Sequence, residues 1–180
     1  MKAEIAEMEK IVATLLEAER LSGRHAKLNR TRVRVGELVD ELIDDFFSRE
    51  RERISVESPA QPIDADVDEA RVTLLLKNLV GNALRYSTAE SGPVVLSYRE
   101  DGDDLVFTVS DKGPGLSEDQ VEHLGEPFYR SDPSRTRDSG GTGLGLYLAT
   151  LVAKAHRGTL AVIDQDLPGA SFEVRLPRIA

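Results

Sequence analysis

Two glycine-rich segments constrain this chain more than any other feature of its sequence. Residues 111–115 (Asp-Lys-Gly-Pro-Gly) directly follow an alternating apolar run at 105–110, which predicts a strand. Residues 140–146 (Gly-Gly-Thr-Gly-Leu-Gly-Leu) precede an apolar stretch with helical spacing. A carboxylate at a strand end, with glycines that clear space and expose backbone amides at a helix start, predicts a pocket for a phosphorylated ligand.

The composition excludes several other classes of site. The second glycine segment lacks the Gly-Lys-Ser/Thr ending of a P-loop, and it lacks the preceding strand of a dinucleotide-binding fold. The 180 residues include no cysteine, which excludes disulfides and thiolate metal sites. A net charge of -9 argues against a dedicated nucleic-acid binder. No apolar run approaches the roughly 20 residues that cross a bilayer, and no signal peptide is visible, so we expect this chain to be cytoplasmic.

Apolar periodicity predicts an α+β domain. Helices are expected at 1–22, at 36–50, from a cap at Asp66 or Asp68 to about Tyr86, at 120–124 and at 143–156. Strands are expected at 28–35, 53–57, 93–100, 105–111, 159–163 and 170–176. This order favours helices on one face of a mixed sheet over doubly wound layers.

The helix that ends near Tyr86 carries an unusual polar face. Asn78, Asn82 and Arg85 lie at helical spacing on one side, beside an apolar stripe. Asparagine is a mediocre helix former, so two of them in a largely buried helix indicate either a functional face or amides that bond buried backbone. The segment 112–142 has little apolar periodicity, and a loop of this length in a compact domain is usually functional.

These pieces together resemble the catalytic, ATP-binding domain of bacterial sensor histidine kinases, within the superfamily of gyrase, heat-shock-chaperone and mismatch-repair ATPases. The resemblance covers about residue 30 to the end. It rests on four segments in order: the asparagine box at 78–86, the first glycine box at 111–115, the phenylalanine box at 126–130 and the second glycine box at 141–146. The family implies a Bergerat-type fold, a two-layer α+β sandwich whose mainly antiparallel mixed sheet has helices on one face, preceded here by an N-terminal helix.

The resemblance also implies roles for individual residues, with ATP and Mg²⁺ as cofactors. Asp111 is expected to accept a hydrogen bond from the adenine amino group, and Asn82 to bind Mg²⁺. Arg130 and Arg135, in an ATP lid at about 112–142, are expected to reach the γ-phosphate. The other expected nucleotide contacts are Arg85 and Tyr86 near the phosphates, Gly113 and Gly115 beside the base, Phe128 in the lid, and Gly141, Thr142, Gly143, Leu144 and Gly145 at the triphosphate.

Asn78 bears on the reaction. Members of the superfamily that hydrolyse ATP carry a glutamate at the corresponding position, where it activates water. An amide cannot take a proton near neutral pH, so Asn78 favours phosphoryl transfer to a protein over hydrolysis. Two alternatives stay open: a nucleotide-sensing interaction module without transfer activity, and a serine kinase of the anti-sigma type with the same fold.

The acceptor histidine of such a kinase is not found in this sequence. His25, His123 and His156 all lie outside a His-Glu/Asp-x-x-x-Pro setting, and we interpret them as structural or incidental; the charge of His156 would be favourable at a helix C-terminus. The resemblance implies that residues 1–24 are part of the second helix of a dimerisation hairpin and that 25–180 form the catalytic domain. We therefore do not expect this chain to autophosphorylate alone.

The expected partners follow from the same resemblance. They are ATP, an acceptor hairpin of the same or a partner protomer, and a response regulator in a full-length homodimer anchored in the cytoplasmic membrane. The N-terminal helix carries an apolar stripe at Ile5, Met8, Val12 and Leu15. This stripe either packs on its own domain or belongs to the dimerisation element.

Overall fold

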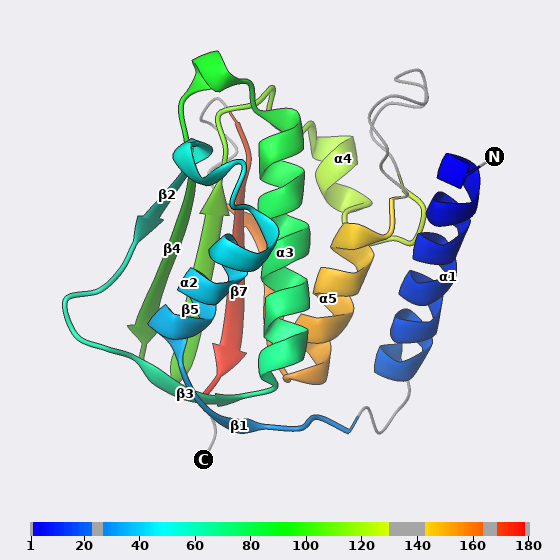
Figure 1. Cartoon of the computed structure of the whole chain (residues 1–180). Helices are drawn as coiled ribbons and strands as arrows, with labels where there is room; N and C mark the ends of the chain where they lie inside the picture. Colours follow the sequence, from blue (N-terminus) through cyan, green and yellow to red (C-terminus); the bar gives the residue numbers. More distant parts are fainter. Residues whose placement is uncertain (1, 23–26, 130–142, 164–168, 179–180) are drawn as a thin grey trace.

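The structure is a computed structural model that describes residues 2–22, 27–129, 143–163 and 169–178 (Figure 1). The helices are α1 (Lys2–Ser22), α2 (Val35–Phe46), η1 (Arg51–Arg53), α3 (Glu69–Tyr86), η2 (Ala89–Ser91), α4 (Glu118–Glu122) and α5 (Gly145–Ala155). The strands are β1 (Thr31–Arg34), β2 (Ile54–Glu57), β3 (Asp64–Val67), β4 (Val94–Asp101), β5 (Asp104–Ser110), β6 (Thr159–Ile163) and β7 (Ser171–Pro177).

One mixed sheet forms the first layer of the domain and helices form the second. The strand order is β2-β4-β5-β7-β6, in which β2 and β4 are parallel and the other neighbours are antiparallel. Helices α2, α3 and α5 lie over the same face of this sheet (Figure 1). The predicted two-layer α+β fold with helices on one face is therefore confirmed.

The core lies between α3 and the central strands. The register pairs Leu96 with Val109 and Val109 with Phe172, so these side chains form one apolar row across β4, β5 and β7. Phe107 and the α3 residue Leu79 are both fully buried in the same core. Alternation along the strands places these residues on the helix-covered face, which explains why both layers were visible as periodicity in the sequence.

Helix α3 begins where one of the two expected caps lies. The Asp68 side chain accepts a hydrogen bond from the Arg71 backbone N–H at 3.2 Å, which identifies Asp68 as the N-cap. The other candidate, Asp66, belongs to strand β3. The helix runs to Tyr86 as predicted, and it presents the polar face of Asn78, Asn82 and Arg85 at its C-terminal half.

Strand β3 was missed in the sequence. It pairs antiparallel with β1 in a separate two-stranded ribbon, and Ala65 and Val67 are buried. Its two aspartates, Asp64 and Asp66, face Arg32 on β1 at 3.9 and 3.5 Å, so opposite charges across the ribbon offset the poor strand propensity of aspartate. Such pairs are visible only once the two strands are known to be neighbours.

Helix α1 buries a different face from the predicted stripe. Met8, Val12 and Leu15 are 66, 54 and 40% exposed, whereas Ala18 and Leu21 are buried and the helix contacts α5. Of the two interpretations of the stripe, packing on its own domain is therefore wrong for these three side chains. None of the helices in the described part of the chain has the length and apolar character that crossing a bilayer requires.

Candidate functional site

Asp111 is held at the end of β5 by backbone groups from two other segments. Its backbone N–H donates to the Ala170 carbonyl at 2.9 Å. Its Oδ1 accepts from the Gly113 N–H at 2.7 Å and from the Ala170 N–H at 3.4 Å. Oδ2 accepts no hydrogen bond from the described residues, so it is the oxygen that can meet a ligand.

The environment of Asp111 works against its charge. The residue is only 8% exposed, and this burial raises the pKa of its carboxyl above the ordinary value, although the N–H groups of Gly113 and Ala170 partly oppose the effect. Buried charged groups are normally paired or bound. A ligand that donates a hydrogen bond to this carboxylate would therefore complete its surroundings, which is the behaviour expected of a group that recognises an amino hydrogen.

Glycines allow three backbone segments to meet around Asp111. A Cβ on Gly113 would lie 2.7 Å from the Tyr86 carbonyl oxygen and 2.9 Å from Asp111 Oδ1. Gly115 has a φ of +77°, and a Cβ there would lie 3.1 Å from the Gly169 carbonyl oxygen. The first glycine segment thus packs directly against the end of α3 on one side and the start of β7 on the other.

The polar face of α3 approaches this loop from the other layer. Asn82 is half-buried and its amide makes no hydrogen bond to any other described residue. Arg85 and Tyr86 are exposed, Tyr86 at 44%. Asn78 differs from them, because its Nδ2 donates to the Leu74 carbonyl at 2.8 Å. One of the two asparagines therefore bonds backbone, as one interpretation of the sequence expected, while the other is available.

Helix α5 begins against Asn78. A Cβ on Gly145 would lie 2.7 Å from Asn78 Oδ1, so this glycine permits the close approach of α5 to α3. The first hydrogen bond within α5 runs from the Leu148 N–H to the Leu144 carbonyl at 2.9 Å. The preceding N–H groups have no partner within the helix, and together with the helix dipole they suit an anion.

The phenylalanine box and the second glycine box meet in space. Gly143 has a φ of +71°, and a Cβ there would lie 2.8 Å from the Tyr129 carbonyl oxygen and 2.9 Å from the Phe128 carbonyl carbon. Phe128 is 58% exposed and has a φ of +65°, which is unfavourable for a bulky side chain. Unusual backbone of this kind is concentrated at functional sites, so Phe128 stays a candidate ligand contact.

The structure brings most of the predicted residues to one edge of the domain, with two qualifications. Leu144 is fully buried, so any contact with a nucleotide would come from its backbone. Four predicted residues lie outside the described residues: Arg130, Arg135, Gly141 and Thr142.

His156 corrects the expectation of a favourable positive charge. Its ring is fully buried, its Nε2 accepts from the Asp68 backbone N–H at 3.2 Å, and its Nδ1–H donates to the Val152 carbonyl at 2.9 Å. Burial lowers the pKa of the imidazole, so it is neutral near pH 7. The structural interpretation of His156 therefore stands, but as a neutral link between α3 and α5. His25 lies outside the described residues.

His123 is the C-cap of the short helix α4. Its Nδ1 lies 3.2 Å from Glu126 Oε1, and its ring lies 5.3 Å from that of Tyr129. The hydrogen bond with Glu126 raises the pKa of His123 above its ordinary value. These contacts stabilise the turn that carries Phe128, so His123 has a local structural role.

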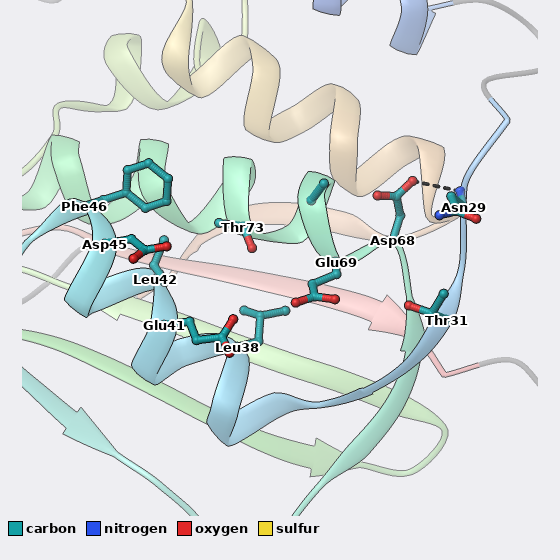
Figure 2. Close-up of a pocket in the computed structure, with 11 residues that line it drawn as sticks. Asn29, Thr31, Leu38, Glu41, Leu42, Asp45, Phe46, Asp68, Glu69 and Thr73 are labelled. Atoms are coloured by element: carbon teal, nitrogen blue, oxygen red, sulfur yellow. Dashed lines mark hydrogen bonds between the residues drawn. The ribbon is translucent and has the colours of Figure 1, made fainter.

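A separate cavity of about 560 Å³ lies between α2 and α3 (Figure 2). Its rim carries the carboxylates of Glu41, Asp45 and Glu69, above an apolar floor that includes Leu38 and Leu42. None of the predicted nucleotide contacts lines it. A negative rim repels phosphates, so this cavity is distinct from the candidate site.

Three residues that contribute to the site were missed in the sequence. Gly169 has a φ of +106° and lies against the Asp111 backbone, and Ala170 bonds Asp111 twice. The Pro-Gly pair at 168–169 directly before the last strand was the available signal. Arg53 was also missed, and it contacts the end of α3.

The comparison with protein families decides the class. The family described as "Histidine kinase-, DNA gyrase B-, and HSP90-like ATPase" matches residues 67–180, which contain all four boxes. The chain belongs to this family. Membership in the histidine kinase-, DNA gyrase B- and HSP90-like ATPases confirms the resemblance seen in the sequence.

Within this family, the chain is similar to sensor histidine kinases. The chain is 34% identical over 182 residues to the sensor histidine kinase MtrB of Mycobacterium tuberculosis, covering 99% of this chain and 32% of the relative. It is 31% identical over 180 residues to the sensor histidine kinase CpxA of Escherichia coli, covering 98% of this chain and 38% of the relative. This chain thus spans about a third of the length of these curated relatives.

A solved structure, that of ShkA, has a similar fold. Full-length ShkA, whose crystal structure is a complex with AMPPNP, superposes with a TM-score of 0.80 at 26% identity, covering 97% of this chain and 36% of that one. A match to 97% of this chain includes most of the N-terminal helix as well as the sheet and the helices that cover it.

Proposed function

We propose that this chain is the ATP-binding kinase domain of a sensor histidine kinase. The observation that carries the proposal is Asp111, a buried carboxylate with one oxygen fixed by two backbone N–H groups and the other free of the described residues. An ionised carboxylate only accepts hydrogen bonds, so it selects adenine, which presents an amino group, over guanine, which presents a carbonyl there. Family membership and the AMPPNP complex of ShkA support ATP as the ligand.

The other residues would divide the nucleotide between them. Arg85 and Tyr86, both exposed at the end of α3, and the N–H groups at the start of α5 would hold the phosphates. The chemistry of Asn82 fits Mg²⁺, since its amide oxygen is a ligand of the preferred kind and is free of the described residues. When bound, the ion would neutralise phosphate charge. Arg130 and Arg135 would reach the γ-phosphate from the lid at about 112–142, which would include Phe128 and end next to Gly143.

Asn78 supports transfer over hydrolysis. Its amide has no basic site for the proton of an attacking water, and its NH₂ group is already bonded to the Leu74 carbonyl. The nucleophile would then be a histidine outside 1–180, on a hairpin of which residues 1–24 supply part of the second helix, with 25–180 as the catalytic domain. We propose a homodimer and a response regulator for the whole protein.

Phosphotransfer to a separate acceptor tests this function. The chain would be incubated with γ-labelled ATP, Mg²⁺ and a dimerisation hairpin from MtrB, with the hairpin's histidine replaced by glutamine as a control. Acid-labile label on the histidine hairpin alone is the expected result. ATP binding without any label would favour the nucleotide-sensing module, acid-stable phosphoserine would favour the anti-sigma-type kinase, and failure to bind ATP would overturn all three.

A further inference from the structure

Arg53 lies outside every box yet binds the end of the helix that carries one of them. It is the last residue of η1, directly before the edge strand β2. A single nitrogen of its guanidinium group, Nη2, donates to the Leu84 carbonyl and to the Ser87 carbonyl, each at 3.0 Å. Both acceptors belong to the last turn of α3 or to its C-cap.

Helix α3 requires such a partner because its own ending satisfies few carbonyls. The last carbonyls of a helix have no partner within it, and many helices end in a left-handed glycine whose N–H groups bond them. Here the C-cap is Ser87 in extended conformation, and both its N–H and its hydroxyl go to one carbonyl, that of Ala83, at 3.0 and 2.6 Å. Arg53 supplies a donor for two further carbonyls, those of Leu84 and Ser87, and its positive charge is favourable at a helix C-terminus.

The turn that Arg53 bonds connects the two ends of the proposed site. Arg85 and Tyr86, the proposed phosphate contacts, lie between the two bonded carbonyls in the sequence. The Tyr86 carbonyl oxygen also packs against Gly113, which in turn binds Asp111 Oδ1 at 2.7 Å. The conformation of this turn therefore sets the position of the phosphate contacts relative to the base contact.

We propose that Arg53 is a positioning residue that fixes the distance between the phosphate end and the adenine end of the site. The inference rests on the proposed function. It predicts that loss of Arg53 weakens a ligand that spans both ends more than a ligand that uses the adenine end alone, because only the first needs the correct spacing.

The test compares Mg·AMPPNP with adenosine by titration calorimetry. The variants are Arg53→Gln, which removes the charge and shortens the side chain, and Arg53→Lys, which keeps a cation. Arg51→Gln is the matched control, since Arg51 belongs to the same turn but its side chain bonds, among the described residues, only the local Ile54 carbonyl at 3.2 Å. We expect Arg53→Gln to weaken AMPPNP about 10-fold or more while adenosine changes less than about threefold. Arg53→Lys should recover part of the AMPPNP affinity, and Arg51→Gln should match the wild type.

The outcomes separate this inference from the proposed function. Wild-type protein that binds neither ligand would overturn the proposed function itself. Wild-type binding with equal losses for both ligands in Arg53→Gln, or with no loss for either, would overturn only the role of Arg53. If circular dichroism shows that Arg53→Gln is unfolded, amide hydrogen exchange in Arg53→Lys tests the role of Arg53 instead. Faster exchange confined to residues 84–87 and 113 would support the role, and unchanged exchange there would refute it.

Discussion

Replacement of Asp111 by asparagine separates binding from stability. The amide has nearly the same shape, and its oxygen can keep the place of Oδ1, which accepts from the Gly113 N–H at 2.7 Å and the Ala170 N–H at 3.4 Å. The changed atom is Oδ2, which becomes an NH₂ group. Two donors would then face each other where the carboxylate would accept from the adenine amino group.

The loss of binding can be bounded from the chemistry of this one contact. A hydrogen bond to a charged group contributes about 1.5–3 kcal/mol. At about 1.4 kcal/mol for each factor of ten, Asp111→Asn should weaken Mg·AMPPNP roughly 10- to 150-fold. The corresponding guanine nucleotide should lose less or gain, because its carbonyl oxygen can accept from the new NH₂ group.

The effect on stability should have the opposite sign. Burial raises the pKa of Asp111, so the folded protein holds its charged form less readily than the unfolded chain does. The unfavourable contribution is absent below the unfolded pKa of 3.8 and is fully present once the pH has risen above the folded pKa. At pH 7 the neutral amide removes it, so the melting temperature of Asp111→Asn should equal or exceed that of the wild type.

Calorimetric titration and thermal unfolding at pH 7 measure both effects. Asp103→Asn is the matched control, because it removes the same charge from the exposed β4–β5 turn at the far end of β5. It should change neither quantity. Unchanged AMPPNP affinity in Asp111→Asn would refute the proposal that Asp111 contacts adenine. A melting temperature lower than that of the wild type would refute the claim that burial of the ionised carboxylate destabilises the domain.

Two further predictions concern the packing that supports the site. Gly145→Ala should destabilise the domain by about 1–3 kcal/mol in urea unfolding, because the new Cβ would lie 2.7 Å from Asn78 Oδ1. The control Gly81→Ala should stabilise the domain by about 0.5–1 kcal/mol, because no atom lies within 4 Å of its Cβ. Equal effects of the two substitutions would contradict the close approach of α5 to α3. Burial lowers the pKa of His156, so its contribution to the free energy of unfolding should be fully present above the unfolded pKa of 6.5. As the pH drops below 6.5, this free energy should fall by up to about 1.4 kcal/mol per pH unit. A His156→Gln variant in which the free energy of unfolding keeps the wild-type pH dependence would exclude this histidine as the cause.

The sequence was sufficient for the parts of the fold that follow from periodicity and capping. The apolar alternation of β5 and β7 and the cap at Asp68 are local signals, and each is present in the structure. The misses are contacts between segments far apart in the chain. Strand β3 depends on charge pairs with β1, and the buried face of α1 depends on where α5 lies.

The same distinction applies to the candidate site. The boxes identified Asp111, Gly113 and Gly143 because each is unusual in its local sequence. Ala170 and Arg53 are not unusual in their local sequence. Their roles come from contacts with residues far away in the chain, Ala170 with Asp111 and Arg53 with the end of α3. His156 shows how a correct local rule fails, since a helix C-terminus favours a positive charge in water but not in a fully buried ring.

The candidate site is built where the fold alone leaves groups unsatisfied. Asp111 is buried with one oxygen free of the described residues, Phe128 has an unfavourable φ and an exposed ring, and the start of α5 has N–H groups without helical partners. Each of these features is unfavourable for the stability of the domain, and one part of a nucleotide would supply a partner for each group: an amino hydrogen for the Asp111 carboxylate, an apolar surface for the Phe128 ring and a phosphate for the N–H groups of α5. A ligand that supplies all three should therefore stabilise the domain by more than its affinity for any one part implies, and ATP is the ligand whose parts match them.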